Sequence, residues 1–490
     1  MEQEYIKLIF GLKLRQIRAE RDLSLSGLAR LSGMSKSYLN EIEKGKKYPK
    51  PDKIAILSEK LEVPYDQLVS LKLDKNLAPI GKLLQSKVLK EVPLDLFGIE
   101  ESKLIDIVAN APAKVNAFIS TIIEIAQNYN FSRENFFLAS VRSLQEANNN
   151  YFEEIEHQIP RFRKLFKKEL SSPLTADALE AILVNKYDYT INDTELNKYE
   201  ALERLRAVYV PKNKTLLLAD TLDEAQRCFI YAKEIAYNFL EIKDRLYTFS
   251  WIKFDNFEQV INNFYASYFA GALIIPRDEL TKKLGALFEK KSFDRQLFIE
   301  TLEAFNSSPE TFYQRLTNIL PRSFNIQDLF FLRFTHRAGS GRFHLTKELH
   351  LSHQQSPRAN ENNEHYCRRW VSLKVLQDIT WNGAEHEFDL QISQYADGKR
   401  YLVLSSATKD PFRTDQYRSI SLGLLINKHL ERKLKFLDDD QLKSARVGVT
   451  CERCGLEDCM VRQKPPLILE KEARDKKTES IVVELAEKFG

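Results

Sequence analysis

The chain has 490 residues, 43% of them hydrophobic and 29% charged, so it can bury several cores and by length suggests about three domains. No apolar run reaches the roughly 18 residues that a membrane-spanning helix needs. Glu2 and Glu4 precede the first apolar stretch, where a secretory signal would carry basic residues. We therefore expect a cytoplasmic protein that does not enter a membrane. The formal net charge is +4, and residues 1–75 alone hold 15 Lys and Arg against 11 Asp and Glu.

The first 72 residues contain five helical patterns separated by turn signals. Helical spacing of apolar residues predicts a first helix over 6–21, and Ser24 suits the N-cap of a second helix that ends at Gly33. Ser35 precedes a third helix over 36–44. Prolines 49 and 51 precede a fourth over 52–61, and Pro64 opens a fifth.

The segment LSLSGLARLSGMSKSYLNEIEKGKKYPKPDKIAILSEKLEV resembles the Cro/C1-type (Xre) family of helix-turn-helix domains. In that family the third helix enters the major groove of double-stranded DNA. The resemblance implies that Lys36, Ser37, Tyr38, Asn40 and Glu41 read bases and that Ser24, Lys44, Lys46 and Lys47 bind phosphates. It also implies a structural ion pair between Arg18 and Glu43, whereas Leu25 stands where many relatives carry a phosphate-binding Gln. The alternative is a helical bundle that mediates only protein contacts.

Residues 73–170 are expected to form a helical linker or dimerisation region. Helical patterns lie around 112–129 and 132–158, and the first carries an apolar stripe from Val115 to Ala126. The stripe fits either packing on the next domain or dimerisation. Groove-reading proteins of this kind usually bind two half-sites as dimers, so we expect a homodimer.

Residues 171–320 change to a pair of strands, ERLRAVYVP and KTLLLA, followed by the helical segments QRCFIYAKEIAYNFLEI and NNFYASYFAGALIIPRDEL. This order resembles the zinc-peptidase-like domain of the ImmA/IrrE type, whose HExxH helix and following carboxylate bind zinc. Alignment places Lys233 and Tyr237 at the histidine positions and Asn263 at the carboxylate position, so only Glu234, the general base, remains. We expect no hydrolysis without the metal ligands. The former cleft is either a ligand pocket or a rigid core.

Residues 321–490 read as a mixed α+β sensor-like domain, with a hairpin turn at Ala396-Asp397-Gly398. The tail VGVTCERCGLEDCMVRQKPP holds Cys451, Cys454 and Cys459, and with Cys367 these thiols could bind one structural zinc. Buried or reactive thiols are the alternative. Cys228, on an apolar helix, is expected in the core.

Taken together, the Xre segment, the peptidase-like middle and the Cys-rich tail resemble the short-chain fatty acyl transcriptional regulator family over nearly the full chain. That resemblance implies control of genes of carbon metabolism through a short-chain acyl-CoA or a related metabolite. Spacing and composition reveal no CoA site. The segment RAGSGR, residues 337–342, is a weak phosphate-loop candidate and reads better as a hairpin turn.

The predicted fold is multidomain: a mainly α five-helix Cro/C1-type bundle, an α+β peptidase-like middle and an α+β C-terminal domain. The predicted function is sequence-specific regulation of transcription by a non-enzymatic protein that senses a small molecule. One rival hypothesis is a DNA-bound metallopeptidase that acts on a partner repressor, and another is an antitoxin-like interaction protein.

Overall fold

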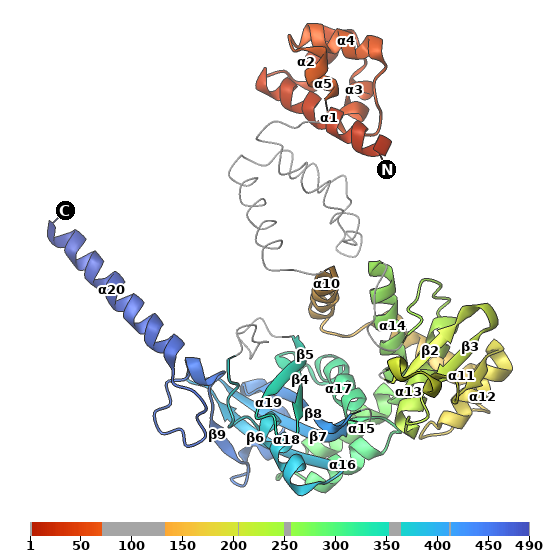
Figure 1. The fold of residues 1–490 in the computed structure, drawn as a ribbon, viewed down its shortest axis with the longest axis vertical. Coiled ribbons are helices and arrows are strands. Elements are labelled where there is room, and N and C mark those ends of the chain that lie inside the picture. The colour runs from red at the N-terminus through yellow and green to blue at the C-terminus, as the bar shows by residue number, and fades with distance from the viewer. Residues whose placement is uncertain are drawn as a thin grey trace. The chain divides into compact units, whose positions relative to one another are not determined.

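The computed structural model describes residues 2–70, 133–203, 205–248, 256–351, 364–410 and 413–489 (Figure 1). The chain divides into two compact units, Met1–Ala139 with Asn256–Glu258, and Ser140–Asp255 with Gln259–Gly490. The predicted helix over 112–129 and its apolar stripe lie outside the described residues. Among the helices that are described, none is long and apolar enough to cross a membrane.

The N-terminal bundle contains the five predicted helices. They are α1 (Glu2–Glu20), α2 (Leu25–Ser32), α3 (Lys36–Glu43), α4 (Pro51–Lys60) and α5 (Tyr65–Val69). The Ser24 and Ser35 hydroxyl oxygens accept from the Gly27 and Tyr38 amides, and Gly33 ends α2 with φ 68°. Gly11 lets α1 approach α3 closely, because an added Cβ would lie 2.3 Å from the Ile42 carbonyl oxygen. The predicted fold class of this region is confirmed.

The helix expected over 132–158 is two helices, so that prediction was wrong. One helix, α10, spans Arg133–Ala147, and the next, α11, spans Glu153–Leu165. Asn149 and Asn150 between them have φ of 49° and 51°, a left-handed conformation that Asn tolerates and a helix does not. Asn150 is fixed there because its side chain donates to Thr317 Oγ1 over 2.7 Å.

A three-stranded sheet forms the centre of the peptidase-like part. Its order is β1 (Thr190–Asn192), β3 (Thr215–Leu218) and β2 (Ala207–Val210), with β1 parallel and β2 antiparallel to β3. The strand pair and the helices predicted after it are present. The surrounding helices are α12 (Ala176–Tyr187), α13 (Glu224–Phe239), α14 (Phe257–Ile274) and α15 (Arg277–Phe288), with short 3-10 turns at Leu196–Lys198, Glu200–Leu202 and Pro211–Asn213.

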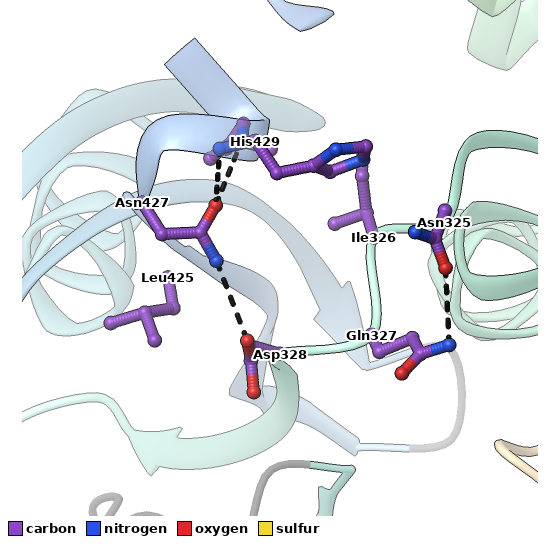
Figure 2. A pocket seen from close by; sticks show the side chains of 8 residues that line it. Asn325, Ile326, Gln327, Asp328, Leu425, Asn427 and His429 are labelled. Carbon is purple, nitrogen blue, oxygen red and sulfur yellow. Dashed lines mark hydrogen bonds between the residues drawn. The ribbon is translucent and has the colours of Figure 1, made fainter. Parts of the chain in front are cut away.

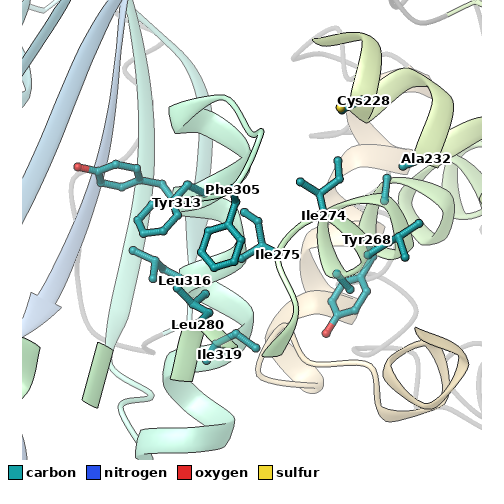
Figure 3. Packing of buried hydrophobic residues seen from close by; sticks show 14 of the residues in the cluster. Cys228, Ala232, Tyr268, Ile274, Ile275, Leu280, Phe305, Tyr313, Leu316 and Ile319 are labelled. Atoms are coloured by element: carbon teal, nitrogen blue, oxygen red, sulfur yellow. The ribbon is translucent and has the colours of Figure 1, made fainter. Parts of the chain in front are cut away.

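One continuous apolar core runs from these helices to the C-terminal sheet. Ile274 and Ile275, at the end of α14, lie between Tyr268 on one side and Leu280, Phe305 and Leu316 on the other (Figure 3). The helices α16 (Arg295–Glu303) and α17 (Pro309–Phe324) contribute to the same cluster. The proposed domain boundary at 320 falls inside α17 and stays a prediction.

The C-terminal sheet has six strands in the order β5-β4-β8-β7-β6-β9. They are β4 (Leu329–Arg337), β5 (Phe343–His350), β6 (His386–Gln394), β7 (Arg400–Asp410), β8 (Arg413–Leu425) and β9 (Ser444–Arg446). Alternate residues of β7 belong to different cores: Leu402 packs with the α17 side, and Val403 packs with α18 (Val371–Asn382). The inner strand β7 is therefore buried on both faces, and Figure 1 shows the helices that flank the sheet.

The predicted turns of this domain are present. Gly398 has φ 83° between β6 and β7, and the RAGSGR segment is the β4–β5 turn, with Gly339 and Gly341 at positive φ. The remaining elements are α19 (Lys428–Lys433), 3-10 turns at Lys435–Asp438 and Cys451–Arg453, and α20 (Leu467–Phe489). The helix α20 buries none of its residues. The predicted α+β class is confirmed.

Candidate nucleic-acid interface and the former metal site

The third helix of the bundle buries its apolar residues together with Glu43 and leaves its other polar residues accessible. Leu39 and Ile42 are fully buried, whereas Lys36 and Ser37 are exposed and Tyr38, Asn40 and Glu41 are half-buried. The predicted base-reading residues therefore share the outer side of α3. Reading the major groove requires accessible polar side chains near the start of a helix, and this group of residues meets that requirement.

The basic residues after α3 form a second exposed group. Lys44, Lys46 and Lys47 follow one another around the stop at Gly45 and are exposed. Lys47 lies 3.2 Å from Glu41 and 5.5 Å from the centre of the Tyr38 ring, which ties this lysine to the recognition surface. Ser24, which is also exposed, uses its oxygen to cap α2 and keeps its hydroxyl hydrogen to donate.

Arg18 and Glu43 join α1 to α3, as the sequence resemblance implies. The Arg18 guanidinium donates to both Glu43 oxygens over 2.6 and 2.9 Å and to the Leu23 carbonyl over 2.7 Å. The hydrogen bond to Glu43 raises the pKa of Arg18. Sequence patterns missed Lys13, which is buried and donates to the Gln67 and Ser70 carbonyl oxygens, at the end of α5. These contacts fix how α3 is held.

The three positions aligned with zinc ligands come together in the peptidase-like part. Lys233 Nζ donates to Asn263 Oδ1 over 2.6 Å, and the Tyr237 hydroxyl donates to the same oxygen over 3.3 Å. Lys233 is 6% exposed, and burial, with help from the charge of Arg245, lowers its pKa to about 7. The three aligned side chains thus contact one another, but they are an amine, a phenol and an amide, where a zinc site of this type has two imidazoles and a carboxylate.

The remaining residue of the motif, Glu234, is enclosed. It is 0% exposed, and Arg245 donates to both of its oxygens, one over 2.8 Å, while the Tyr189 hydroxyl donates over 2.8 Å. The guanidinium lies 4.2 Å from the Tyr209 ring centre and 3.9 Å from that of Tyr237. The Glu234 carboxylate is thus bonded to Arg245 and Tyr189 inside the protein.

Sequence reasoning missed Arg245 and Tyr189, since both lie outside the aligned motif. Arg245 follows α13 in an irregular segment, and Tyr189 precedes β1. No local pattern marks either residue. Only the fold brings them to Glu234.

Cys367 interacts electrostatically with two of the other predicted metal-binding cysteines, Cys451 and Cys454. The Cys367 amide donates to the Val449 carbonyl over 3.1 Å, and the Cys451 amide donates to that of His365 over 2.8 Å. Burial raises the pKa of Cys367, whose thiol lies near Cys451 and Cys454. Cys459 is half-exposed and further along the tail. Cys228 is fully buried.

The Cys-rich turn is held by backbone contacts. Arg462 donates to the carbonyl oxygens of Cys451 and Cys454 over 3.2 and 3.3 Å. Gly448 leaves room for the turn, because a Cβ there would lie 2.7 Å from Cys454 Sγ. Across the described residues, no group of three or more His, Cys, Asp or Glu side chains has an arrangement that could hold a metal ion.

A polar pocket lies between the end of α17 and the β8–α19 turn (Figure 2). Asn427 donates to Asp328 over 3.4 Å and accepts from the His429 amide over 3.0 Å, and Gln327 donates to Asn325 over 3.2 Å. Its polar groups thus bond to one another. None of the residues predicted from the sequence lines this pocket.

Comparison with known families assigns three segments of the chain. Residues 14–68 match the helix-turn-helix model, 184–317 match the IrrE N-terminal-like domain, and 352–482 match the short-chain fatty acyl coenzyme A regulator C-terminal domain. The chain carries all three domains. With this set it is a DNA-binding transcriptional regulator, as the sequence resemblance predicted.

Known proteins resemble this regulator over different spans. The HTH-type transcriptional regulator RamB of Mycobacterium tuberculosis is 23% identical, over 94% of this chain and 95% of its own length. The HTH-type transcriptional repressor RghR of Bacillus subtilis is 44% identical over 61 residues, 12% of this chain and 45% of its own. A solved Mycobacterium tuberculosis transcriptional regulator is 20% identical with a TM-score of 0.46, covering 66% of this chain and 92% of its own.

Proposed function

We propose that this regulator binds a short-chain acyl-CoA or a related metabolite and that the ligand changes its affinity for an operator. The observation that carries the proposal is the match of residues 352–482 to the acyl coenzyme A regulator domain, in the same chain as a helix-turn-helix domain. A ligand can act in this way when it binds two conformations of the protein with different affinity. Since the DNA of the bacterial relatives lies in the cytoplasm, we assign the protein to that compartment.

We propose that the exposed side of α3 reads the operator. Asn40 suits adenine and Lys36 suits guanine, with Ser37, Tyr38 and Glu41 beside them. Ser24, Lys44, Lys46 and Lys47 would fix the register by binding phosphates. A homodimer would present two such helices to two half-sites, which is how most proteins of this design read DNA.

We propose that the peptidase-like part is a rigid, non-catalytic core. The buried pair of Glu234 and Arg245 and the contact of Lys233 with Asn263 support this role. Lys233, Tyr237 and Asn263 replace the two histidines and the carboxylate that hold zinc in this type of domain, and hydrolysis of this type requires the metal to activate water.

We also propose a structural zinc held by Cys367, Cys451, Cys454 and Cys459. Thiolates are the ligands that structural zinc sites favour, and Cys367 interacts electrostatically with Cys451 and Cys454. Zinc would fix the tail against the segment that precedes α18. Elemental analysis of the purified chain and of a Cys451→Ser/Cys454→Ser variant tests this: zinc near one equivalent that is lost in the variant is expected, and no zinc in either contradicts it.

The sensing proposal is tested on the full chain. Thermal unfolding is measured with and without acetyl-, propionyl- and butyryl-CoA, and operator binding is measured by gel shift with the same thioesters. At a ligand concentration 100 times the Kd we expect a stabilisation of about 2.7 kcal/mol and a shifted operator affinity. If no short-chain thioester changes either measurement, the proposal is wrong. Zinc that disappears on Glu234→Gln substitution would instead support a peptidase.

A further inference from the structure

Four basic side chains lie around one carboxylate, that of Glu310, where α17 meets the C-terminal sheet. Glu310, in the first turn of α17, lies 3.0 Å from Arg333, 3.5 Å from Lys347 and 4.0 Å from Arg418. Arg206, which precedes β2, interacts electrostatically with Glu310 and with Asp410, at the end of β7. We call these six residues the Glu310 cluster.

The strand register explains why the basic residues meet. Arg333 on β4 lies opposite Lys347 on β5. Arg418 on β8 lies opposite Thr335, two residues from Arg333, and therefore on the same side of the sheet. Sequence reading could not find this set, because its members come from five strands or strand ends and one helix.

The cluster holds more positive than negative charge. Four cations face two carboxylates, which leaves a net charge of +2. Burial alone would raise the pKa of Glu310, but Arg333, Lys347 and Arg418 hold it well below its ordinary range. Burial lowers the pKa of both Arg206 and Lys347, and the charge of Arg333 lowers it further. Burial is the largest of these causes for both groups.

The basic side chains are still reachable from solvent. Lys347 is 46% exposed, Arg333 28% and Arg418 14%. Partial burial strengthens their field, because the low-dielectric surroundings screen charge less than water does. Arginine guanidinium groups match the geometry of phosphate oxygens and can bind them with two parallel hydrogen bonds.

We propose that the Glu310 cluster binds a phosphate group of a phosphorylated ligand. A phosphate dianion would balance the surplus charge of +2 without moving the Glu310 carboxylate out of its pairs. For a CoA thioester, this inference rests on the proposed function, and the cluster would take the phosphates at the nucleotide end. Free phosphate or another nucleotide could supply the same chemistry.

Isothermal titration of the full chain with four probes separates these sources. The probes are inorganic phosphate, adenosine 3′,5′-bisphosphate, propionyl-CoA and S-propionyl-N-acetylcysteamine, which has the thioester but no phosphate. We expect Arg418→Gln to weaken the bisphosphate and propionyl-CoA by about tenfold, the loss of one charged hydrogen bond. Lys347→Gln, at a more exposed site that tolerates substitution, should weaken both in the same direction. The phosphate-free thioester should bind wild type and variants alike.

Two further variants test whether phosphate affinity rises with the net charge of the cluster and whether the effect is confined to the cluster. Glu310→Gln raises the net charge of the cluster and should tighten the bisphosphate. Arg337→Gln removes an exposed arginine of β4, the strand that also carries Arg333. Arg337 pairs with Asp415 outside the Glu310 cluster, so its loss should leave the affinity for every probe unchanged. Thermal unfolding of each variant without ligand checks that it folds.

The outcomes separate this inference from the proposed function. Wild-type affinity for propionyl-CoA in both Arg418→Gln and Lys347→Gln overturns the cluster as a phosphate site while acyl-CoA sensing stands. Bisphosphate binding that depends on Arg418, with no response to any acyl-CoA, supports the cluster and overturns acyl-CoA sensing. If no phosphate-bearing probe binds the wild-type chain, the cluster is a structural ion network and the proposal is wrong.

Discussion

The helices α3 and α13 both carry a polar motif shared with a known family, yet they use it in opposite ways. On α3 the apolar residues are buried and the motif's polar residues face outward. On α13 the polar residues Lys233 and Glu234 are themselves buried, and each bonds to other side chains of the protein. A polar group that is exposed can bind a partner, whereas one that is buried and satisfied stabilises the fold.

This difference separates a motif whose side chains can meet a partner from one whose side chains are bonded inside the fold. A helix-turn-helix domain needs only exposed donors at the right spacing, which the fold presents without further support. A metal site needs ligands that stay uncommitted inside the protein, at a high cost in desolvation. On α13, Arg245 supplies the counter-charge that the buried Glu234 requires.

The largest expected effect comes from breaking the buried pair on the α13 side. Arg245→Met leaves Glu234 as an uncompensated buried charge and should lower the free energy of unfolding by about 3–5 kcal/mol. Urea unfolding of the full chain, followed by circular dichroism, measures this. The double variant Arg245→Met/Glu234→Gln should recover much of the loss, since the carboxylate is gone.

Arg400→Met is the matched control. Arg400 pairs with Glu431 at the surface, where both side chains are more than 40% exposed, so its loss should cost only about 0.2–1 kcal/mol. An equal effect of the two single variants would mean that the Glu234–Arg245 pair is not a determinant of the fold.

The next effect is the pH dependence of the free energy of unfolding that the buried Lys233 causes. Its pKa falls from 10.5 to about 7 on folding. Between these values the unfolded chain binds more protons, so the free energy of unfolding rises with pH, and the penalty is largest below pH 7. Lys233→Met removes the penalty, so the variant should exceed wild type by on the order of 3 kcal/mol near pH 6, an advantage that shrinks towards pH 10.

Thermal unfolding across pH 6–10 measures the difference between these two proteins. Lys290→Met, at an exposed lysine, should give a difference that does not change with pH. A pH-independent effect of Lys233→Met would show that the buried amine is not forced towards its neutral form.

The proposed role of α3 is tested by measuring how substitutions on it change the affinity for an operator. Lys36→Ala and Asn40→Ala should each weaken binding to an operator, obtained by selection from random duplexes, by about 1–3 kcal/mol. The unfolding transition should not move, because both side chains lie at the protein surface. Fluorescence anisotropy gives the affinities, with Lys60→Ala at the far end of α4 as the control. Full operator affinity in both variants would exclude these residues as readers.

The smallest effect distinguishes phosphate binding from base reading. Lys46→Gln should weaken binding to all DNA sequences alike and reduce the slope of log affinity against log salt by about 1. Anisotropy titrations at several salt concentrations, with operator and unrelated duplexes, measure both quantities. A loss confined to the operator would assign Lys46 to base reading instead.

The sequence alone determined what depends on local chemistry. Caps at Ser24 and Ser35, turn glycines at 33 and 398, and the spacing of apolar residues predicted the helix-turn-helix bundle and the β6–β7 hairpin. Helical spacing also placed Lys233 and Tyr237 on one side of α13. These features involve neighbours within four residues, so short-range patterns suffice.

Only the tertiary structure decided what closes the former metal site and where the surplus charge gathers. Arg245 reaches Glu234 from an irregular segment, and Asn150 ends α10 through a contact with Thr317 on α17. The Glu310 cluster draws on residues more than 200 positions apart. Such contacts depend on strand register and helix packing, which bring distant residues together without leaving a periodic signal in the sequence.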